Sequence, residues 1–476
     1  MNRSLRIAVV GGGITGLAAA HRLVELGHAT PPQITLFEAS PRLGGLVATQ
    51  QIQGYTLELG PDSFITNKPW AVDLCRRLGL EEQLIPTDPQ YRRSFVLRRG
   101  KPVVVPDGFQ LMTPARIWPV LTSSIFSWWG KLRMGCEYFL PARRDVIDES
   151  LASFVRRRFG QEVLERLVQP LVGGIYTSDP EKLSLRATLP RFLDMEQRFG
   201  SLIRASRAAA KTSDRSEQAS GARYGLFATH AGGTAQIVQA LASKISDMAE
   251  VITHACVTQV EPLSSGGYRL TCGASSREFD RVIFTIPTYQ IADLVEPFAT
   301  KFAQALREIE YASTTIVVSG HKFSDVRHPL DAFGLVVPAI EKRRILAVSF
   351  TSRKFPNRAP DGCVQLRTFV GGAMQPELFL LSDDETKQLV REELRDLLGV
   401  GGVPDFEVIA RYPRSMPQYH VGHIDRVARI RELGRQYPGI FLAGSAYDGV
   451  GLPDSIHSGE LAAESGIQSK ENETVS

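Results

Sequence analysis

The chain has 476 residues, of which 43% are hydrophobic and 22% are charged, and its formal net charge is +4. This length favours two or three domains over one simple core, and the small charge excess gives no argument for a nucleic-acid partner. The five cysteines are scattered without a Cys-x-x-Cys pair, which disfavours zinc ribbons and iron–sulfur clusters. Their odd number and the lack of a secretory signal pattern lead us to expect a cytoplasmic protein.

The amino-terminal segment predicts a strand, a helix and a second strand in succession. Residues 6–10 and 34–37 are short apolar runs typical of buried parallel strands, and residues 17–26 carry the apolar stripe of a helix. The second strand ends at Glu38. This order is that of the first unit of a Rossmann-like α/β domain.

A glycine-rich turn, Gly11-Gly12-Gly13-Ile14-Thr15-Gly16, joins the first strand to the helix. We expect Gly11 to allow the tight turn, Gly13 to let a pyrophosphate approach the backbone, and Gly16 to let helix and strand pack closely. The free N–H groups at the helix start then face the phosphates, and Glu38 is placed to accept hydrogen bonds from a ribose hydroxyl. The pattern predicts a dinucleotide site.

Arg42-Leu43-Gly44-Gly45 follows Glu38 and Ala39 closely. The resulting Glu-x-x-x-Arg-x-Gly-Gly resembles the FAD-binding enzymes of the amine-oxidase and protoporphyrinogen-oxidase superfamily. This resemblance implies that FAD is the dinucleotide, and that the segment from Arg42 to Gly45 lines its pyrophosphate.

Residues 54–60 predict a strand that ends in the turn Gly60-Pro61-Asp62-Ser63. The resemblance implies that this turn passes beside the flavin. Residues 70–78 predict a helix that Gly79 ends.

Residues 86–210 predict an inserted helical domain with helices at 118–138, 150–159, 162–171 and 189–210. The most apolar stretch is too short and too polar to span a membrane. Its aromatic residues, Trp118, Phe126, Trp128 and Trp129, either fill a helical core, wall a ligand pocket or touch a membrane surface.

The remaining sequence predicts a return to the nucleotide-binding domain and then a second sheet. We expect a helix after Gly232-Gly233-Thr234 and strands at 251–260, 268–272 and 281–285. Residues 301–410 predict a mostly antiparallel sheet with strands at 315–319, 334–337, 345–350 and 365–370 and a helix at 383–398. The predicted fold is therefore α/β, with a Rossmann-like FAD-binding domain (1–85, 225–300 and 411–467), the helical insert 86–210 and a mixed-sheet substrate domain (301–410).

Two segments near the carboxyl end narrow the resemblance. Met416-Pro417-Gln418-Tyr419-His420-Val421-Gly422-His423 and the loop Gly449-Val450-Gly451 before Pro453-Asp454 resemble the protoporphyrinogen/coproporphyrinogen oxidase family. We reject a metal site at His420 and His423, because Pro417 and Gly422 break the helix and no acidic third ligand is near. A helix from about Asp454 to Gly466 would direct its amino end at the flavin, and no cysteine near the loop offers a thioether, so we expect FAD to be non-covalent.

The resemblance implies a set of cofactor-binding residues drawn from the whole chain: Gly11, Gly12, Gly13, Ile14, Thr15, Gly16, Glu38, Ala39, Arg42, Gly45, Gly60, Pro61, Asp62, Ser63, Val257, Tyr412, Gly449, Val450 and Gly451. It also implies that Lys68 pairs with a substrate propionate, although a solvated lysine before Pro69 is an equal alternative. Arg92, Arg93, Arg204 and Arg207 are further basic candidates that the sequence does not rank.

The function implied is the FAD-dependent oxidation of a porphyrinogen in two-electron steps, with O2 as acceptor and peroxide as product. The segment after Gly60 resembles the bacterial branch that acts on coproporphyrinogen III. Oxidation of protoporphyrinogen IX, a flavin amine oxidase, a carotenoid desaturase and a non-catalytic porphyrin carrier remain alternatives. The sequence identifies no general base and does not show the oligomeric state.

Overall fold

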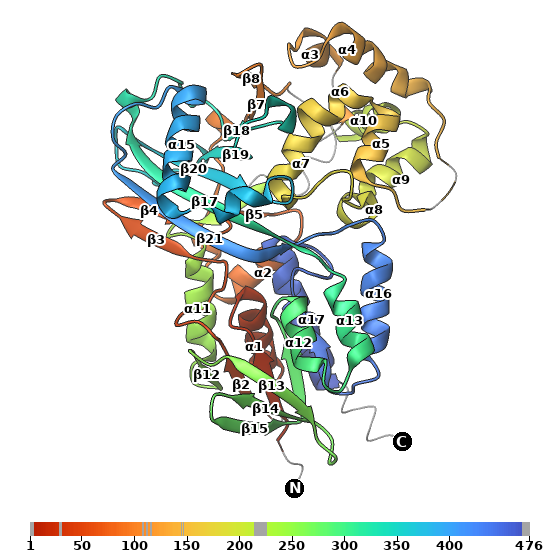
Figure 1. Cartoon of the computed structure of the whole chain (residues 1–476), viewed down its shortest axis with the longest axis vertical. Coiled ribbons are helices and arrows are strands. Elements are labelled where there is room, and N and C mark those ends of the chain that lie inside the picture. The colour runs from red at the N-terminus through yellow and green to blue at the C-terminus, as the bar shows by residue number, and fades with distance from the viewer. Residues whose placement is uncertain are drawn as a thin grey trace.

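A five-stranded parallel sheet lies in the lower half of the molecule (Figure 1). The computed structural model describes residues 4–468, except for 28–30, 107–108, 111–112, 115–116, 144, 146 and 214–225. The sheet order is β12-β2-β1-β16-β22, and every neighbouring pair is parallel. Its strands come from distant parts of the chain: β1 (Arg6–Val10), β2 (Gln33–Phe37), β12 (Ala249–Ile252), β16 (Arg281–Phe284) and β22 (Ile440–Leu442). This arrangement confirms the Rossmann-like α/β prediction.

Both faces of this sheet are covered, which explains the continuous apolar runs of its strands. Ile7 and Val9 of β1 point into a core with four helices: α1 (Ile14–Leu26), α2 (Trp70–Arg77), α11 (Ala235–Ile245) and α17 (Leu452–Gln468). Ala8 and Val10 point into a second core with three antiparallel strands and three helices. These are β13 (Val257–Pro262), β14 (Tyr268–Cys272), β15 (Ser275–Phe279), α12 (Thr288–Val295), α13 (Thr300–Arg307) and α16 (His423–Gly434).

A seven-stranded sheet lies above the parallel one (Figure 1). Its order is β21-β17-β20-β19-β18-β7-β8, and all pairs are antiparallel except β18 with β7, so the mixed sheet is confirmed. The strands are β7 (Phe95–Arg98), β8 (Lys101–Val104), β17 (Tyr311–Lys322), β18 (Gly334–Val336), β19 (Ala347–Phe350), β20 (Cys363–Gly371) and β21 (Phe406–Pro417). The helix α15 (Asp383–Leu398) has the bounds predicted from the sequence. The hairpin β7–β8, which lies within the residues 86–210 assigned to the helical insert, and β21, which the sequence pattern missed, both belong to this sheet.

The helical segment differs from its prediction at two places. Residues 118–138 are divided into α3 (Ile117–Thr122) and α4 (Trp128–Gly135), because Ser127 leaves the helix and accepts a hydrogen bond from the Gly130 N–H as the cap of α4. Residues 189–210 are divided by Gly200, whose φ of +71° ends the first helix. The other helices here are α5 (Leu151–Arg158), α6 (Gln161–Val163), the π-turn η4 (Leu164–Val168), α7 (Gln169–Tyr176), α8 (Leu185–Thr188), α9 (Pro190–Phe199) and α10 (Leu202–Ser213).

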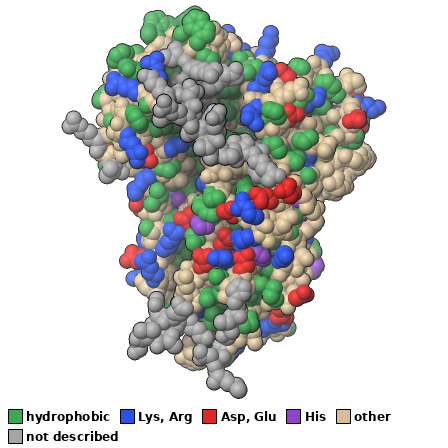
Figure 2. Space-filling view, turned by 180° about the vertical axis from the view of Figure 1, so that it is seen from behind, with side chains coloured by type: hydrophobic (Ala, Val, Ile, Leu, Met, Phe, Trp, Pro, Cys, Tyr) green, Lys and Arg blue, Asp and Glu red, His purple; other side chains and the backbone are tan. Residues whose placement is uncertain are grey.

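The tryptophans of α3 and α4 do not fill a core. Trp118, Trp128 and Trp129 are 74%, 76% and 80% exposed, whereas Phe126 is buried. Figure 2 shows hydrophobic side chains gathered at the upper end of the molecule and charges of both signs across its middle. Across the described ranges, no helix has the length and apolar character needed to cross a membrane.

Short elements connect these layers. The hairpin β3–β4 and the strands β5 and β6 come between β2 and β7 in the chain, and the Gly60–Ser63 turn joins β4 to β5. The strand β11 completes the small sheet β5-β11-β6. Their bounds are β3 (Thr49–Ile52), β4 (Tyr55–Glu58), β5 (Phe64–Ile65), β6 (Leu84–Pro86) and β11 (Phe227–His230), and the remaining pieces are β9 (Phe109–Gln110), β10 (Thr113–Pro114) and α14 (Thr351–Lys354).

The crossing of α1 and α17 provides a test of the lower core. A Cβ on Gly459 would overlap the Thr15 carbonyl oxygen, whereas a Cβ on Gly466 would lie 3.7 Å from its nearest neighbour, Ile283 Cδ1. We expect Gly459→Ala to lower the free energy of unfolding by about 1–3 kcal/mol, because the two helices must separate. Gly466→Ala on the same helix should raise it by up to about 1 kcal/mol. Equal denaturation midpoints for the two variants would contradict this contact.

Candidate functional site

The glycine loop at the carboxyl end of β1 leaves one face of its backbone open. A Cβ on Gly11, whose φ is +110°, would lie 2.7 Å from Thr285 Oγ1, and a Cβ on Gly16 would overlap the Gly11 carbonyl oxygen. In contrast, a Cβ on Gly13 would meet no protein atom closer than the Gly45 Cα at 4.0 Å. Gly13 is also the cap residue of α1 and has no side-chain cap hydrogen bond. The loop therefore fits a phosphate group at the start of α1.

Glu38 holds this loop from the neighbouring strand. Its Oε2 accepts a hydrogen bond of 2.7 Å from the Gly12 N–H, and its Oε1 accepts one of 2.7 Å from the Ser40 N–H. Each carboxylate oxygen retains acceptor capacity for a ribose hydroxyl. The Glu38 carbonyl, in turn, accepts a bond from the Ala255 N–H, which brings Val257 at the start of β13 near Glu38 and Ala39.

The segment after Glu38 folds back onto the glycine loop. The Gly44 N–H donates to the Gly12 carbonyl at 2.8 Å, and a Cβ on Gly45 would lie 3.1 Å from the Gly13 Cα. Arg42 donates to the carbonyls of Leu43, Gly45 and Val47 at 3.3, 2.6 and 3.2 Å. Its guanidinium thus fixes the backbone of the Gly44–Gly45 turn, a structural role that the motif alone did not indicate.

The turn Gly60-Pro61-Asp62-Ser63 packs against the same segment. A Cβ on Gly60 would overlap the Leu46 carbonyl oxygen, and Tyr412 from β21 donates its hydroxyl hydrogen to the Leu59 carbonyl at 2.8 Å. The structure therefore brings Tyr412 of the upper sheet to this turn of the lower half.

Asp62 lies in a largely buried cluster with two cations. Lys354 Nζ donates to both carboxylate oxygens at 3.0 and 3.1 Å, and Arg367 Nη1 lies 3.2 Å from Oδ2. Burial by itself would raise the pKa of Asp62, but Lys354 and then Arg367 outweigh it and hold this pKa well below its ordinary value. Lys354 also donates to Ser63 Oγ, and Arg367 donates to the Gly60 carbonyl.

Sequence reasoning missed Lys354 and Arg367. Both belong to the upper sheet region, in α14 and β20, about three hundred residues from Asp62 in the chain. The only available signal was a cation within the apolar run of β20, where Arg367 is 2% exposed. Together Asp62, Lys354 and Arg367 carry one net positive charge at the Gly60–Ser63 turn.

The loop before α17 is shaped around Asp454. A Cβ on Gly449 would overlap the Asp454 carboxyl carbon, and one on Gly451 would lie 2.9 Å from Oδ2, so both glycines make room for this carboxylate. Asp454 Oδ1 accepts a bond of 2.5 Å from Lys68 Nζ. Lys68 is thus ion-paired with Asp454, and its side chain is 38% exposed. Val450, between the glycines, packs against the helical segment.

The other basic candidates, the four arginines named from the sequence, have different surroundings in the structure. Arg93 forms an ion pair of 3.3 Å with Asp331, whereas Arg204 and Arg207 both lie over the Tyr138 ring, at 4.5 and 5.5 Å. Arg92 is exposed. They do not form one cluster with Lys68.

His420 and His423 have different surroundings. The His423 ring stacks on Tyr419 at 3.8 Å, and burial, followed by Arg426, lowers its pKa to about 4. His420 instead lies 3.7 Å from Glu310. Among the residues with described placement, no three His, Cys, Asp or Glu side chains are grouped to hold a metal ion.

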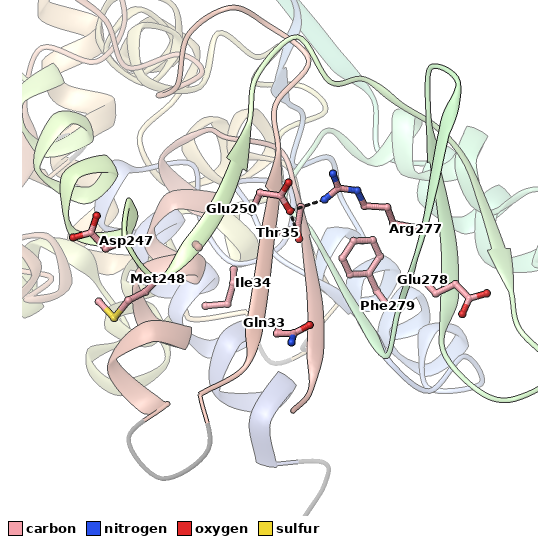
Figure 3. Close-up of a pocket in the computed structure, with 10 residues that line it drawn as sticks. Gln33, Ile34, Thr35, Asp247, Met248, Glu250, Arg277, Glu278 and Phe279 are labelled. Carbon is pink, nitrogen blue, oxygen red and sulfur yellow. Dashed lines mark hydrogen bonds and ion pairs between the residues drawn. The ribbon is translucent and has the colours of Figure 1, made fainter. Parts of the chain in front are cut away.

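A pocket of about 510 Å³ lies at the opposite end of the parallel sheet (Figure 3). It is lined by the first residues of β2 and β12 and by β15, and Glu250 bridges its wall by pairing with Arg277 at 2.5 Å. Ligands of open α/β sheets bind at the carboxyl ends of the strands, where Gly11 and Glu38 lie. We therefore assign the candidate site to the glycine loop and not to this pocket.

Comparison with known proteins finds relatives along nearly the whole chain. A family model described as flavin containing amine oxidoreductase matches residues 14–465. The coproporphyrinogen III oxidases of Bacillus subtilis and Staphylococcus aureus are 34% and 32% identical to this chain, over 96% of it and over 96% and 98% of their own lengths. A crystal structure from Exiguobacterium sp. 255-15, provisionally assigned as a protoporphyrinogen oxidase, superposes with a TM-score of 0.87 at 31% identity, covering 97% of this chain and 98% of that one.

The open face of Gly13 gives a prediction that separates ligand binding from folding. We expect Gly13→Val to abolish FAD binding, because its branched side chain would fill the space left for the pyrophosphate. The apo-protein should unfold at nearly the same denaturant concentration as the wild type, since no protein atom occupies that space. Gly16→Val, whose Cβ overlaps protein backbone, should instead lower the unfolding midpoint. A fully yellow Gly13→Val protein would contradict the site.

The Asp62 cluster predicts a dependence of stability on pH. Because its pKa in the folded protein lies below the unfolded value of about 3.9, the ionised carboxylate stabilises the fold above about pH 4, and this contribution is lost as the pH falls through the folded pKa. Asp62→Asn should cost about 3–5 kcal/mol at neutral pH by leaving Lys354 and Arg367 without their partner. It should also flatten the decline in stability between about pH 5 and pH 2.

The matched control is Asp73→Asn, which removes an exposed pair with Arg76 and should change unfolding by less than about 1 kcal/mol. Denaturant unfolding of the apo-proteins across this pH range measures both effects. If the free energy of unfolding of Asp62→Asn fell with pH in parallel with that of the wild type, Asp62 would not be the source of the loss of stability in acid.

Proposed function

Since the chain belongs to the flavin-containing amine oxidoreductase family and uses FAD, we propose that it oxidises coproporphyrinogen III to coproporphyrin III, with O2 as the acceptor. The observation that carries this proposal is similarity to coproporphyrinogen III oxidases along nearly the whole length of both chains. The packing of the segment Gly44–Leu46 against both the glycine loop and the Gly60–Ser63 turn supports it, and Lys68, which follows this turn, pairs with Asp454 of the last loop.

The FAD site of the proposal follows the contacts described above. The pyrophosphate would lie on the open face of Gly13 at the start of α1, with Gly12, Ile14 and Thr15 supplying neighbouring backbone. Glu38 would bind the ribose, and Ala39 and Val257 would border the adenosine end. The flavin ring would lie toward the Gly60–Ser63 turn, Tyr412 and the Gly449–Gly451 loop. With no cysteine in that loop, we propose that the cofactor is held without a covalent bond.

In this proposal the protein contributes an electrostatic field and a fixed backbone beside the flavin. FAD supplies the two-electron acceptor for each step of porphyrinogen oxidation. The net positive charge of Lys354, Arg367 and Asp62 and the amino end of α17 both favour negative charge beside the ring. Tyr412 and Arg367 hold the Gly60 turn in place from the upper sheet. No general base is part of the proposal.

The two candidate porphyrinogen substrates differ in the number of their propionate groups. Coproporphyrinogen carries four propionates and protoporphyrinogen two, so the former needs more cationic contacts. Lys68 remains our candidate for one propionate, because an ammonium group has two further N–H donors beside the one given to Asp454. The rival substrate is protoporphyrinogen IX, and a flavin amine oxidase is the more distant alternative.

We propose the following organisation around this site. Residues 1–85, 225–300 and 411–467 build the FAD-binding domain, with β21 shared with the upper sheet; 86–210 form the helical insert, apart from the β7–β8 hairpin; and 301–410 form the substrate domain. We place the protein in the cytoplasm, and any peripheral contact with a membrane surface would use the exposed tryptophans of α3 and α4.

Anaerobic mixing with porphyrinogens tests the function. We expect coproporphyrinogen III to bleach the visible flavin band at about two electrons per flavin, and air to restore it with release of peroxide. Protoporphyrinogen IX should react more slowly, and polyamines should leave the band unchanged. A porphyrin carrier that keeps FAD for structure would not bleach, and bleaching by amines alone would identify an amine oxidase.

A further inference from the structure

Asp454 is a buried carboxylate at a position where a negative charge works against the proposed chemistry. It is the third residue of α17, and its side chain is 8% exposed. The amino end of a helix carries about half a positive charge, so an unpaired carboxylate there would reverse the sign of that end. The reversed field would disfavour negative charge on a neighbouring ring.

The carboxylate is nevertheless built into the loop. The missing side chains of Gly449 and Gly451 create the space that it occupies, so Asp454 fills and shapes the turn that precedes α17. Burial of an ion of this kind is costly unless a partner of opposite charge is close. Neutralising Asp454 is therefore a requirement of the fold as well as of the site.

Lys68 meets this requirement. Its Nζ lies 2.5 Å from Asp454 Oδ1, and within the part of the chain that the structure describes it is the one cation in ion-pair contact with Asp454. The nearby phenols of Tyr176 and Tyr419 cannot replace it, because a phenol carries no positive charge. Burial raises the pKa of both, and burial followed by Asp454 raises the pKa of Tyr176 to about 12, so both stay neutral.

A second contact, between α2 and α17, lies beside this pair. Trp70, the first residue of α2, stacks on His457 of α17 at 4.0 Å with the rings 5° from parallel. The Lys68 ammonium lies 5.9 Å from the Trp70 ring centroid. Lys68 is thus held on the α2 side, facing the first turn of α17.

We infer that Lys68 is a positioning residue that balances the charge of Asp454, so that the amino end of α17 stays positive toward the flavin. This inference rests on the proposed function for the location of the flavin ring. It adds a role for Lys68 that is independent of any propionate contact, and it pairs the amino-terminal segment with the last helix.

Sulfite affinity of the holoenzyme tests the inference without relying on turnover. Sulfite adds to oxidised flavins to give an anionic adduct, so its dissociation constant reports the local field. We expect Lys68→Met to raise this constant about tenfold or more, and Lys68→Met/Asp454→Asn to return it to within about threefold of the wild type. Lys68→Arg should preserve it, because the positive charge remains.

The control removes an ion pair from the other end of α17. Glu464 pairs with Arg22 of α1 at 2.7 Å, and Glu464→Gln should leave the sulfite constant unchanged even if it lowers stability. Should Lys68→Met fail to retain FAD, recovery of FAD in the double variant would support charge balance.

Several results would overturn the inference. One is a Lys68→Met enzyme with wild-type sulfite affinity and a raised KM for coproporphyrinogen, which would leave Lys68 as a substrate contact only. Another is a double variant as weak in sulfite binding as Lys68→Met, or one without FAD. Failure of the wild-type holoenzyme to oxidise coproporphyrinogen would contradict the proposed function alone, since the sulfite series can still be measured.

Discussion

The architecture of the site depends on close contact between three backbone segments at the carboxyl edge of the parallel sheet. The Gly44 N–H donates to the Gly12 carbonyl, a Cβ on Gly45 would lie 3.1 Å from the Gly13 Cα, and a Cβ on Gly60 would overlap the Leu46 carbonyl oxygen. Arg42 and Glu38 fix two of these segments by hydrogen bonds to their carbonyl and amide groups. Because the contacts are made by backbone, they create a narrow, preorganised surface for a phosphate and a flat ring.

A second constraint is that each carboxylate around that surface has partners. Glu38 is satisfied by backbone N–H groups, Asp62 by Lys354 and Arg367, and Asp454 by Lys68. The ion pairs of Asp62 and Asp454 join parts of the chain that are far apart in sequence, so these charges also hold the upper sheet and the last helix to the amino-terminal segment. In the Asp62 cluster the two cations outnumber the one carboxylate, and this local positive charge favours a cofactor that gains negative charge when it is reduced.

Local sequence patterns predicted most of the fold and the residues of the candidate cofactor site. The strand, glycine loop and helix at the amino end, β14 and α15 could be predicted because periodicity and caps mark them, as the Ser382–Glu385 capping box does for α15. The division of residues 118–138 was missed because its break comes from Ser127 and its distant partner Glu162. Lys354, Arg367 and the pairing of Lys68 with Asp454 were missed for a related reason: long-range ion pairs leave no trace in local spacing.

The central claim is that these separated segments converge on one FAD. The most direct measurement is reconstitution: FAD is stripped from the purified protein, and the apo-protein is titrated with FAD while flavin absorbance and fluorescence are followed. The account predicts saturation at one FAD per chain and a yellow protein that releases its flavin on denaturation, without a covalent link. A folded protein that stays colourless in excess FAD would contradict the account.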